Sequence, residues 1–126
     1  MEIRHAAETT YEHGDEDRFT GSVWVNTGLA DGDGTQVALV SFEPGARTRW
    51  HRHPGGQFVT GVTGRGRIAS RGEPTQELHP GDVAYTPAGE WHWHGGGIDS
   101  PMVHVAVNMG GTPEFGEPVS DEDYAR

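Results

Sequence analysis

Two pairs of histidines in this sequence have a spacing that could hold a metal ion. His51 and His53 form one pair, and His92 and His94 form the other. In an extended strand, residues two apart point to the same side, so each pair can present two imidazoles together. One isolated pair is weak evidence. With eight histidines in 126 residues, such a pair arises by accident in roughly every second chain of this composition.

The residues around both pairs make the prediction of a metal site more specific. From Gly45 to Gly64 the sequence runs G-x5-H-x-H-x3-Q-x6-G, and from Gly81 to Gly96 it runs G-x5-P-x-G-x2-H-x3-G. These stretches resemble the two signature motifs of the cupin superfamily. By this resemblance His51, His53, Gln57 and His92 are the four metal ligands, and about two coordination positions stay open for water or substrate.

Two positions depart from the commonest cupin pattern. Gln57 stands where the first motif usually has Glu, and Gly96 stands where the second usually has Asn. A Gln ligand binds through its amide oxygen but is neutral, so the ion keeps its full charge and is a stronger Lewis acid. Nitrogen and oxygen ligands with open positions predict one divalent ion. The ligands alone do not choose between manganese, iron, cobalt and nickel, and zinc stays a further alternative.

Composition and turn spacing predict an all-β domain. The chain has 20 Gly and only 33% hydrophobic residues, and short alternating runs are separated by Gly, Pro and Asp. We expect a cupin-type double-stranded β-helix (jelly-roll) barrel over residues 20–110. Residues 1–19 are expected to form an N-terminal arm, and residues 111–126 a C-terminal tail with a short helix that Ser120 caps.

Charge and residue usage exclude several kinds of chemistry and partner. The net charge is −10, and the nine basic residues are scattered Arg, so neither nucleic acid nor an anionic membrane is an expected partner. The absence of Lys and Cys excludes Schiff-base and thiol chemistry. No segment approaches the ~20 apolar residues of a membrane span, so we expect a cytoplasmic protein with a small-molecule substrate.

Other inward-facing residues are candidates for catalysis and substrate binding. His94 and His104 are candidate acid–base groups, because a nearby dication keeps an imidazole neutral and able to accept a proton. The alternative for His94 is a hydrogen bond to a backbone carbonyl. Thr48 could offer its hydroxyl to a bound oxygen, although strand propensity also explains a Thr there. The candidate substrate-binding residues, for which ordinary core packing is the alternative, are Ala38, Val40, Phe42 and Asn108.

Within the cupins, the chain is most similar to small bacterial proteins that include the manganese-dependent hydroxynitrile lyases. The matching stretches are FEPGARTRWHRHPGGQ (42–57), HPGDV (79–83), PAGEWHWHG (87–95), MVH (102–104) and SDEDY (120–124). The resemblance implies a lyase in which a cyanohydrin hydroxyl coordinates the metal, His94 takes its proton and the bond to cyanide breaks. It also implies manganese as the metal ion, and a homodimer or higher homo-oligomer.

Other functions stay open from the sequence. Three-histidine cupins can activate O₂, so an iron-dependent oxygenase is the second hypothesis, although Gln57 gives no anionic ligand to stabilise higher oxidation states. An isomerase, cyclase or decarboxylating step is a further alternative within this frame. The non-enzyme hypothesis is a ligand-sensing or structural cupin in which the metal only stabilises the barrel.

Overall fold

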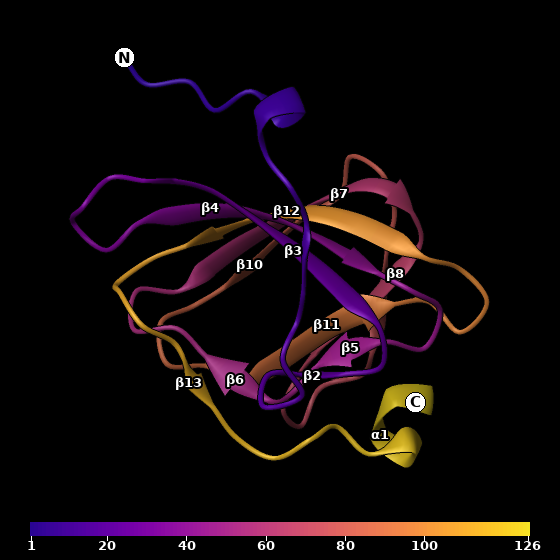
Figure 1. Cartoon of the computed structure of the whole chain (residues 1–126). Helices are drawn as coiled ribbons and strands as arrows, with labels where there is room; N and C mark the ends of the chain where they lie inside the picture. The colour runs from indigo at the N-terminus through magenta and orange to yellow at the C-terminus, as the bar shows by residue number, and fades with distance from the viewer.

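The computed structural model describes residues 1–126, and two β-sheets face each other to form one barrel (Figure 1). The six-stranded sheet has the order β1 (Glu12–His13), β3 (Val23–Ala30), β4 (Gln36–Phe42), β12 (Met102–Asn108), β7 (Gln57–Gly64) and β10 (Val83–Thr86). The seven-stranded sheet contains β13 (Glu114–Phe115), β6 (His51–Arg52), β11 (His92–Gly96), β5 (Arg47–Thr48) and β2 (Phe19–Thr20), with β8 (Gly66–Ser70) and β9 (Gln76–Leu78) beside β11. The prediction of an all-β jelly-roll barrel is confirmed.

One run that alternates in the sequence is broken in the structure. Residues 47–53 form the two short strands β5 and β6, because Arg49 and Trp50 turn their backbone amides to other segments. Arg49 N donates to the carbonyl oxygen of Arg18 at 2.7 Å, and Trp50 N donates to that of Glu117 at 3.1 Å. The break points the Trp50 side chain into a cluster outside the barrel, while His51 remains inside it.

Glycines of the two histidine motifs have structural roles that explain their spacing. Gly45 and Gly81 have φ of 81° and 88°, which lie in the left-handed region that favours glycine at tight turns. Gly96 is required for a different, steric reason. A Cβ there would meet the Glu43 carbonyl oxygen at 2.6 Å, so the buried strand β11 has no room for the Asn that most cupins have at this position.

Two separate hydrophobic clusters hold the sheets. The larger lies between them and includes Val23, Phe42, Val59, Leu78 and Met102. The smaller lies on the outer face of the seven-stranded sheet. Its members are Trp50, Ala69, Trp93, Val119 and Tyr124. Because Trp93 alternates with His92 and His94 along β11, the same strand seals the outer cluster and presents its histidines to the interior.

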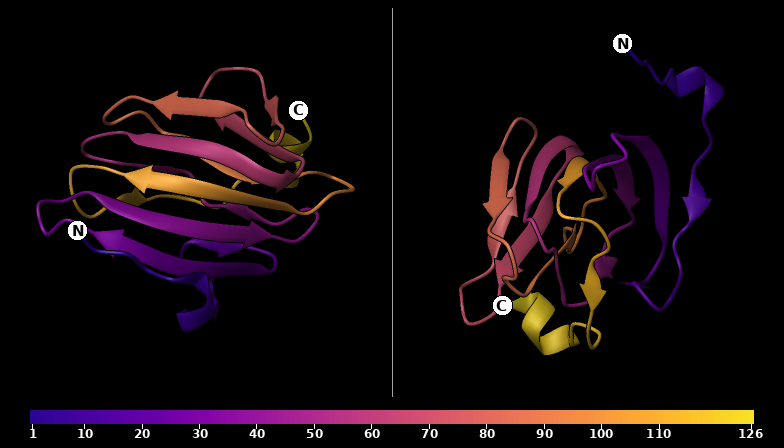
Figure 2. Two further views of the ribbon diagram at one scale, coloured as in Figure 1. Left: turned by 90° about the horizontal axis from the view of Figure 1, so that it is seen from above. Right: turned by 90° about the vertical axis from the view of Figure 1, so that its left-hand side faces the viewer.

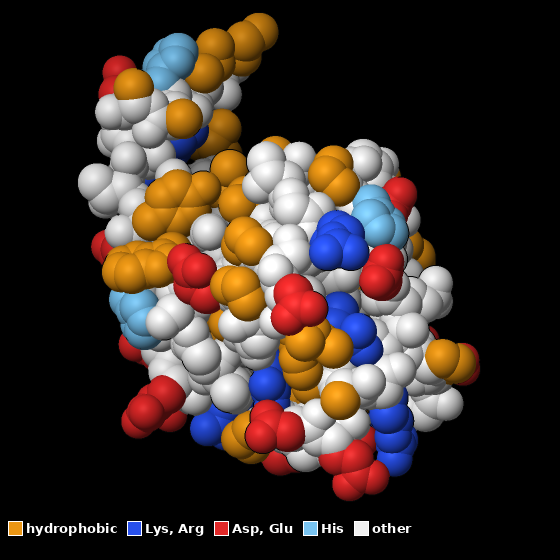
Figure 3. Space-filling model, turned by 90° about the vertical axis from the view of Figure 1, so that its right-hand side faces the viewer, with side chains coloured by type: hydrophobic (Ala, Val, Ile, Leu, Met, Phe, Trp, Pro, Cys, Tyr) orange, Lys and Arg blue, Asp and Glu red, His pale blue; other side chains and the backbone are white.

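The two ends of the chain differ in how they meet the barrel. The N-terminal arm carries a 3-10 turn at Ala6–Glu8 that projects beyond the edge of the six-stranded sheet (Figure 2, right, and Figure 3). The arm is joined to β3 by the pairing of β1 and by a hydrogen bond of 2.7 Å from Asn26 Nδ2 to Thr9 Oγ1. The C-terminal helix α1 (Asp121–Ala125) packs against the seven-stranded sheet, and Ser120 Oγ caps it by accepting from Asp123 N at 3.1 Å. This helix, at five residues, is far too short to cross a membrane, and the chain has no longer one.

Candidate metal centre

Three histidines meet inside the barrel. His51 on β6 and His92 on β11 are directly opposite each other in the antiparallel pair, and their ring centroids are 4.2 Å apart. His53 follows β6, and its ring lies 5.1 Å from that of His51. One ring nitrogen of each of the three lies within 4.8 Å of the other two. These three rings can therefore bind one metal ion.

Backbone carbonyls determine the tautomers of two of the three rings. His51 Nδ1 lies 2.9 Å from the carbonyl oxygen of Arg49, and His92 Nδ1 lies 3.0 Å from that of Glu90. Because a carbonyl oxygen only accepts, each Nδ1 carries the proton and each Nε2 keeps a free lone pair. His53 is buried, and neither of its ring nitrogens has a hydrogen-bond partner. The set offers unprotonated nitrogens of the kind that divalent ions bind.

Gln57, the first residue of β7, adds an oxygen to this set. Its Nε2 donates to Asn108 Oδ1 at 2.8 Å, which leaves Gln57 Oε1 2.8 Å from His92 Nε2. With its proton on Nδ1, His92 has no hydrogen to donate from Nε2, so two lone pairs face each other. A cation between two such acceptors removes their repulsion. The contact therefore fits a metal ion held by three imidazoles and one amide oxygen.

The surroundings keep these rings neutral. Burial lowers the pKa of His51 well below its ordinary value, and the neighbouring His92 lowers it further. Burial, and then His92, lowers the pKa of His53 to about 4. The pKa of His92 is also lowered by burial, although its hydrogen bond to Glu90 opposes the shift. All three are ready to act as metal ligands at neutral pH without first losing a proton.

A second pair of histidines lies beside the metal site. His94 on β11 and His104 on β12 come from opposite sheets, and His104 Nε2 lies 2.9 Å from His94 Nδ1. The ring partner of His94 is thus another imidazole and not a backbone carbonyl. Its Nε2 is buried with no partner. Burial lowers the pKa of His94 well below its ordinary value and that of His104 to about 4, so both rings are neutral.

A cavity of about 210 Å³ connects the two groups of histidines. Most of the residues predicted to hold metal or substrate line it: His51, His53, Gln57, His94, His104, Thr48, Ala38, Val40 and Asn108. His92 lies behind this lining and is fully buried. Phe42 does not line the cavity. It belongs to the core, where its ring packs 5.2 Å from His104 and 6.0 Å from His94.

Two of the lining residues make contacts that the sequence did not suggest. Thr48 Oγ1 accepts a hydrogen bond from the backbone N–H of His94 at 3.2 Å, so its hydroxyl holds strand β11 in place. Asn108 accepts from Gln57, so its side chain orients the Gln57 amide with its oxygen toward His92. Thr48 keeps its hydroxyl proton and Asn108 keeps its Nδ2 group for a bound molecule.

Both ends of the chain contribute residues that sequence analysis missed. Phe115 on β13 stacks on His51 with ring centroids 5.2 Å apart and planes at 20°. The guanidinium of Arg18 lies over the Phe115 ring, 5.2 Å from its centre. Both line the cavity. No motif marks them, because the pairing of β13 with β6 joins segments far apart in the sequence.

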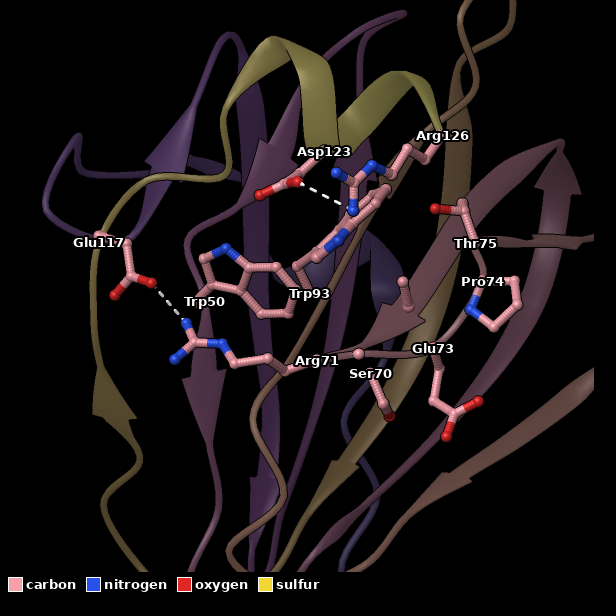
Figure 4. Close-up of a pocket in the computed structure, with 12 residues that line it drawn as sticks. Trp50, Ser70, Arg71, Glu73, Pro74, Thr75, Trp93, Glu117, Asp123 and Arg126 are labelled. Carbon is pink, nitrogen blue, oxygen red and sulfur yellow. Dashed lines mark hydrogen bonds and ion pairs between the residues drawn. The ribbon is translucent and has the colours of Figure 1, made fainter.

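A larger groove of about 420 Å³ lies on the outer face of the seven-stranded sheet (Figure 4). Trp50 and Trp93 line it, with the ion pairs Arg71–Glu117 and Arg126–Asp123 across its surface. The residues lining this groove include no histidine. Of the charged side chains that line it, only Glu73 takes part in no ion pair. The histidine cavity, where several buried titratable groups converge, is the better candidate for a functional site.

The fold and the site together define the class of protein. The family model for the cupin domain matches residues 38–108, which include both histidine motifs and strands β4 to β12. The chain belongs to the cupin family, as the two motifs predicted.

Two relatives are similar to this chain in sequence over most of its length. A curated "(R)-mandelonitrile lyase" of Granulicella tundricola is 39% identical over 131 residues, covering 100% of both chains. The crystal structure of a cupin-like protein of Thermotoga maritima is 42% identical, covers 89% of each chain and superposes with a TM-score of 0.85. A polyketide cyclase of Streptomyces resistomycificus has a TM-score of 0.77 at 17% identity, covering 98% of this chain and 90% of that one, which is a likeness of fold alone.

Proposed function

We propose that this chain is a metal-dependent lyase that reversibly cleaves cyanohydrins to an aldehyde and cyanide. The observation that carries the proposal is the free Nε2 of His94, buried beside the three-histidine group and facing no other protein atom with which to bond. A base and a metal site that share one cavity suit the removal of a hydroxyl proton. The 39% identical relative named as a mandelonitrile lyase supports this reaction.

His51, His53, Gln57 and His92 would hold the ion, and we expect manganese. When bound, a divalent ion supplies Lewis acidity, which favours loss of the proton from a hydroxyl beside it. The shell contains no carboxylate, so nothing in it offsets the charge of the ion. Unlike an oxygenase, this reaction needs no change of oxidation state, and the neutral ligand set supports that choice.

His94 acts as the base. Its Nε2 accepts the hydroxyl proton of the cyanohydrin, the carbonyl forms, and the carbon–carbon bond breaks with its electron pair leaving on cyanide. The protonated ring then returns the proton to cyanide, so aldehyde and hydrogen cyanide leave. In the tautomer that this step requires, His94 Nδ1 donates to His104 Nε2, which lies 2.9 Å away, and His104 stabilises the positive charge that forms. A positioned base contributes about 10²–10⁴-fold to such a step.

The remaining residues bind and orient the substrate. Ala38 and Val40 form an apolar wall of the cavity, and Asn108 offers its Nδ2 group. Thr48 holds the backbone of His94 and offers its own hydroxyl proton. The proposal also includes a cytoplasmic location and a homodimer or higher homo-oligomer, with no nucleic acid and no membrane as partner.

The test compares purified wild type with His94→Ala and His53→Ala, with His79→Ala as the matched control. His79 is half-exposed and is not part of the cavity lining. We expect about one metal ion per chain in every protein except His53→Ala, and benzaldehyde release from mandelonitrile only by wild type and the control. A wild-type protein that binds about one metal ion per chain but does not cleave mandelonitrile would contradict the lyase proposal. Uptake of O₂ by the iron-loaded protein would favour the oxygenase instead.

A further inference from the structure

Arg18 is the only residue with a permanent charge in the cavity lining. The chain has 19 Asp and Glu, yet none of them lines the cavity. The metal ligands are three imidazoles and an amide, and His94 and His104 are neutral as well. An anion that enters this cavity therefore meets one guanidinium and a metal ion, and no carboxylate that repels it.

The position of Arg18 is defined by the segments that carry the metal ligands. Its carbonyl oxygen accepts from Arg49 N at 2.7 Å, two residues before His51. Its guanidinium lies over the Phe115 ring, and Phe115 stacks on His51. Arg18 takes part in none of the salt bridges of the chain. The Phe115 ring thus contacts both the Arg18 guanidinium and the proposed metal ligand His51, and the guanidinium has no acidic partner.

We infer that the cavity binds substrates that carry a carboxylate about one ring's length from the reacting carbon, and that Arg18 pairs with this carboxylate. The inference rests on the proposed function, because it places the reacting carbon beside His94. An aromatic cyanohydrin with a para carboxylate has the required length. Its ring can lie along the apolar wall of Ala38 and Val40, and guanidinium binds carboxylate through two parallel hydrogen bonds.

A binding measurement tests this without turnover. 4-(Hydroxymethyl)benzoate and benzyl alcohol are titrated into the manganese-loaded protein by calorimetry, with wild type, Arg18→Gln, Arg18→Lys and the control Arg65→Gln. Arg65 lies outside the cavity lining, and its substitution changes the net charge equally. We expect wild type and Arg65→Gln to prefer the benzoate by about 3–10-fold, the size of one charge-assisted pair with an exposed arginine. Arg18→Gln loses this preference and Arg18→Lys keeps part of it.

The outcomes separate the two proposals. Equal binding of both compounds by wild type, or an Arg18→Gln variant that keeps the preference, overturns the role of Arg18. If the benzoate preference depends on Arg18 but neither mandelonitrile nor its para-carboxylate is cleaved, the anion site stands and the lyase proposal fails. If mandelonitrile is cleaved but the carboxylate gives no advantage in KM, the lyase proposal stands and this inference fails.

Discussion

Asn108 holds Gln57, the fourth proposed metal ligand, by a hydrogen bond of 2.8 Å from Gln57 Nε2 to Asn108 Oδ1. The bond matters because an amide can present either its oxygen or its NH₂ group, and only the oxygen can bind a cation. The two residues are opposite each other in the β7–β12 pair. The sheet register therefore places an acceptor where it turns the oxygen of Gln57 toward His92.

We predict that Asn108→Leu weakens manganese binding by about 10-fold or more, since loss of a group that orients a metal ligand commonly costs 10–100-fold. Leu has the same branching and the same number of side-chain heavy atoms as Asn but cannot accept a hydrogen bond, so the Gln57 amide is free to turn. Asn108→Asp keeps the acceptor and should bind the ion at least as well as wild type. Calorimetric titration of the metal-free proteins gives both values, and equal affinity in Asn108→Leu would show that Gln57 needs no orienting partner.

Gln57→Glu tests the role of the neutral shell. A carboxylate at this position adds a negative charge beside the ion, so manganese binding should tighten by at least about 10-fold, because charge attraction in a buried site is weakly screened. The same charge reduces the Lewis acidity of the ion, so we expect kcat for mandelonitrile cleavage to fall. Competition with a chelator measures the affinity. A variant that binds more tightly and also turns over faster would contradict our account of why Gln stands here.

The meeting of His51, His53 and His92 inside the barrel could be predicted from the sequence because the motif spacing determines their positions locally. His51 and His53 share a face through strand alternation, and the turn glycines set the distance to Gln57. The parity of Ala38, Val40 and Asn108 also indicated that they face inward. None of these inferences required knowledge of which strands pair.

The remaining contacts depend on pairings that no local pattern encodes. The hydrogen bond from Gln57 to Asn108 requires the register of β7 against β12, and the stack of Phe115 on His51 requires β13 to pair with β6. Phe42 illustrates the opposite case. Its parity matches that of Ala38 and Val40, but it lies deeper between the sheets, where its ring fills the core beneath His94 and His104.

Acid should destabilise the metal-free protein, and the lowered pKa of His104 gives the direction of this effect. Burial lowers its folded pKa from 6.5 to about 4, so between these values the unfolded chain binds a proton that the folded chain does not. The stabilisation by neutral His104 is complete above pH 6.5 and is lost as the pH falls toward 4, by about 3 kcal/mol at most. Urea unfolding at pH 7 and pH 5 measures the loss. His104→Phe should reduce the loss, whereas His5→Phe on the exposed arm should leave it unchanged.

The C-terminal helix is tied to the strand that carries His92 and His94. Tyr124 Oη donates to the Gly96 carbonyl oxygen at 2.7 Å, and its ring packs against Trp93 with centroids 5.5 Å apart. Tyr124→Phe removes only the hydroxyl and leaves the buried carbonyl without this donor. We expect a loss of about 1–2 kcal/mol in the free energy of unfolding.

Tyr124→Ala additionally removes the ring from the outer cluster and should cost about 3–5 kcal/mol. Urea unfolding measures both variants, and Tyr11→Phe, in the arm, is the control for loss of a hydroxyl. If the helix only covers the sheet, Tyr124→Phe will be as stable as wild type. If it braces β11, the Tyr124 variants will also bind manganese more weakly, in the order of their stability, because the position of His92 depends on that strand.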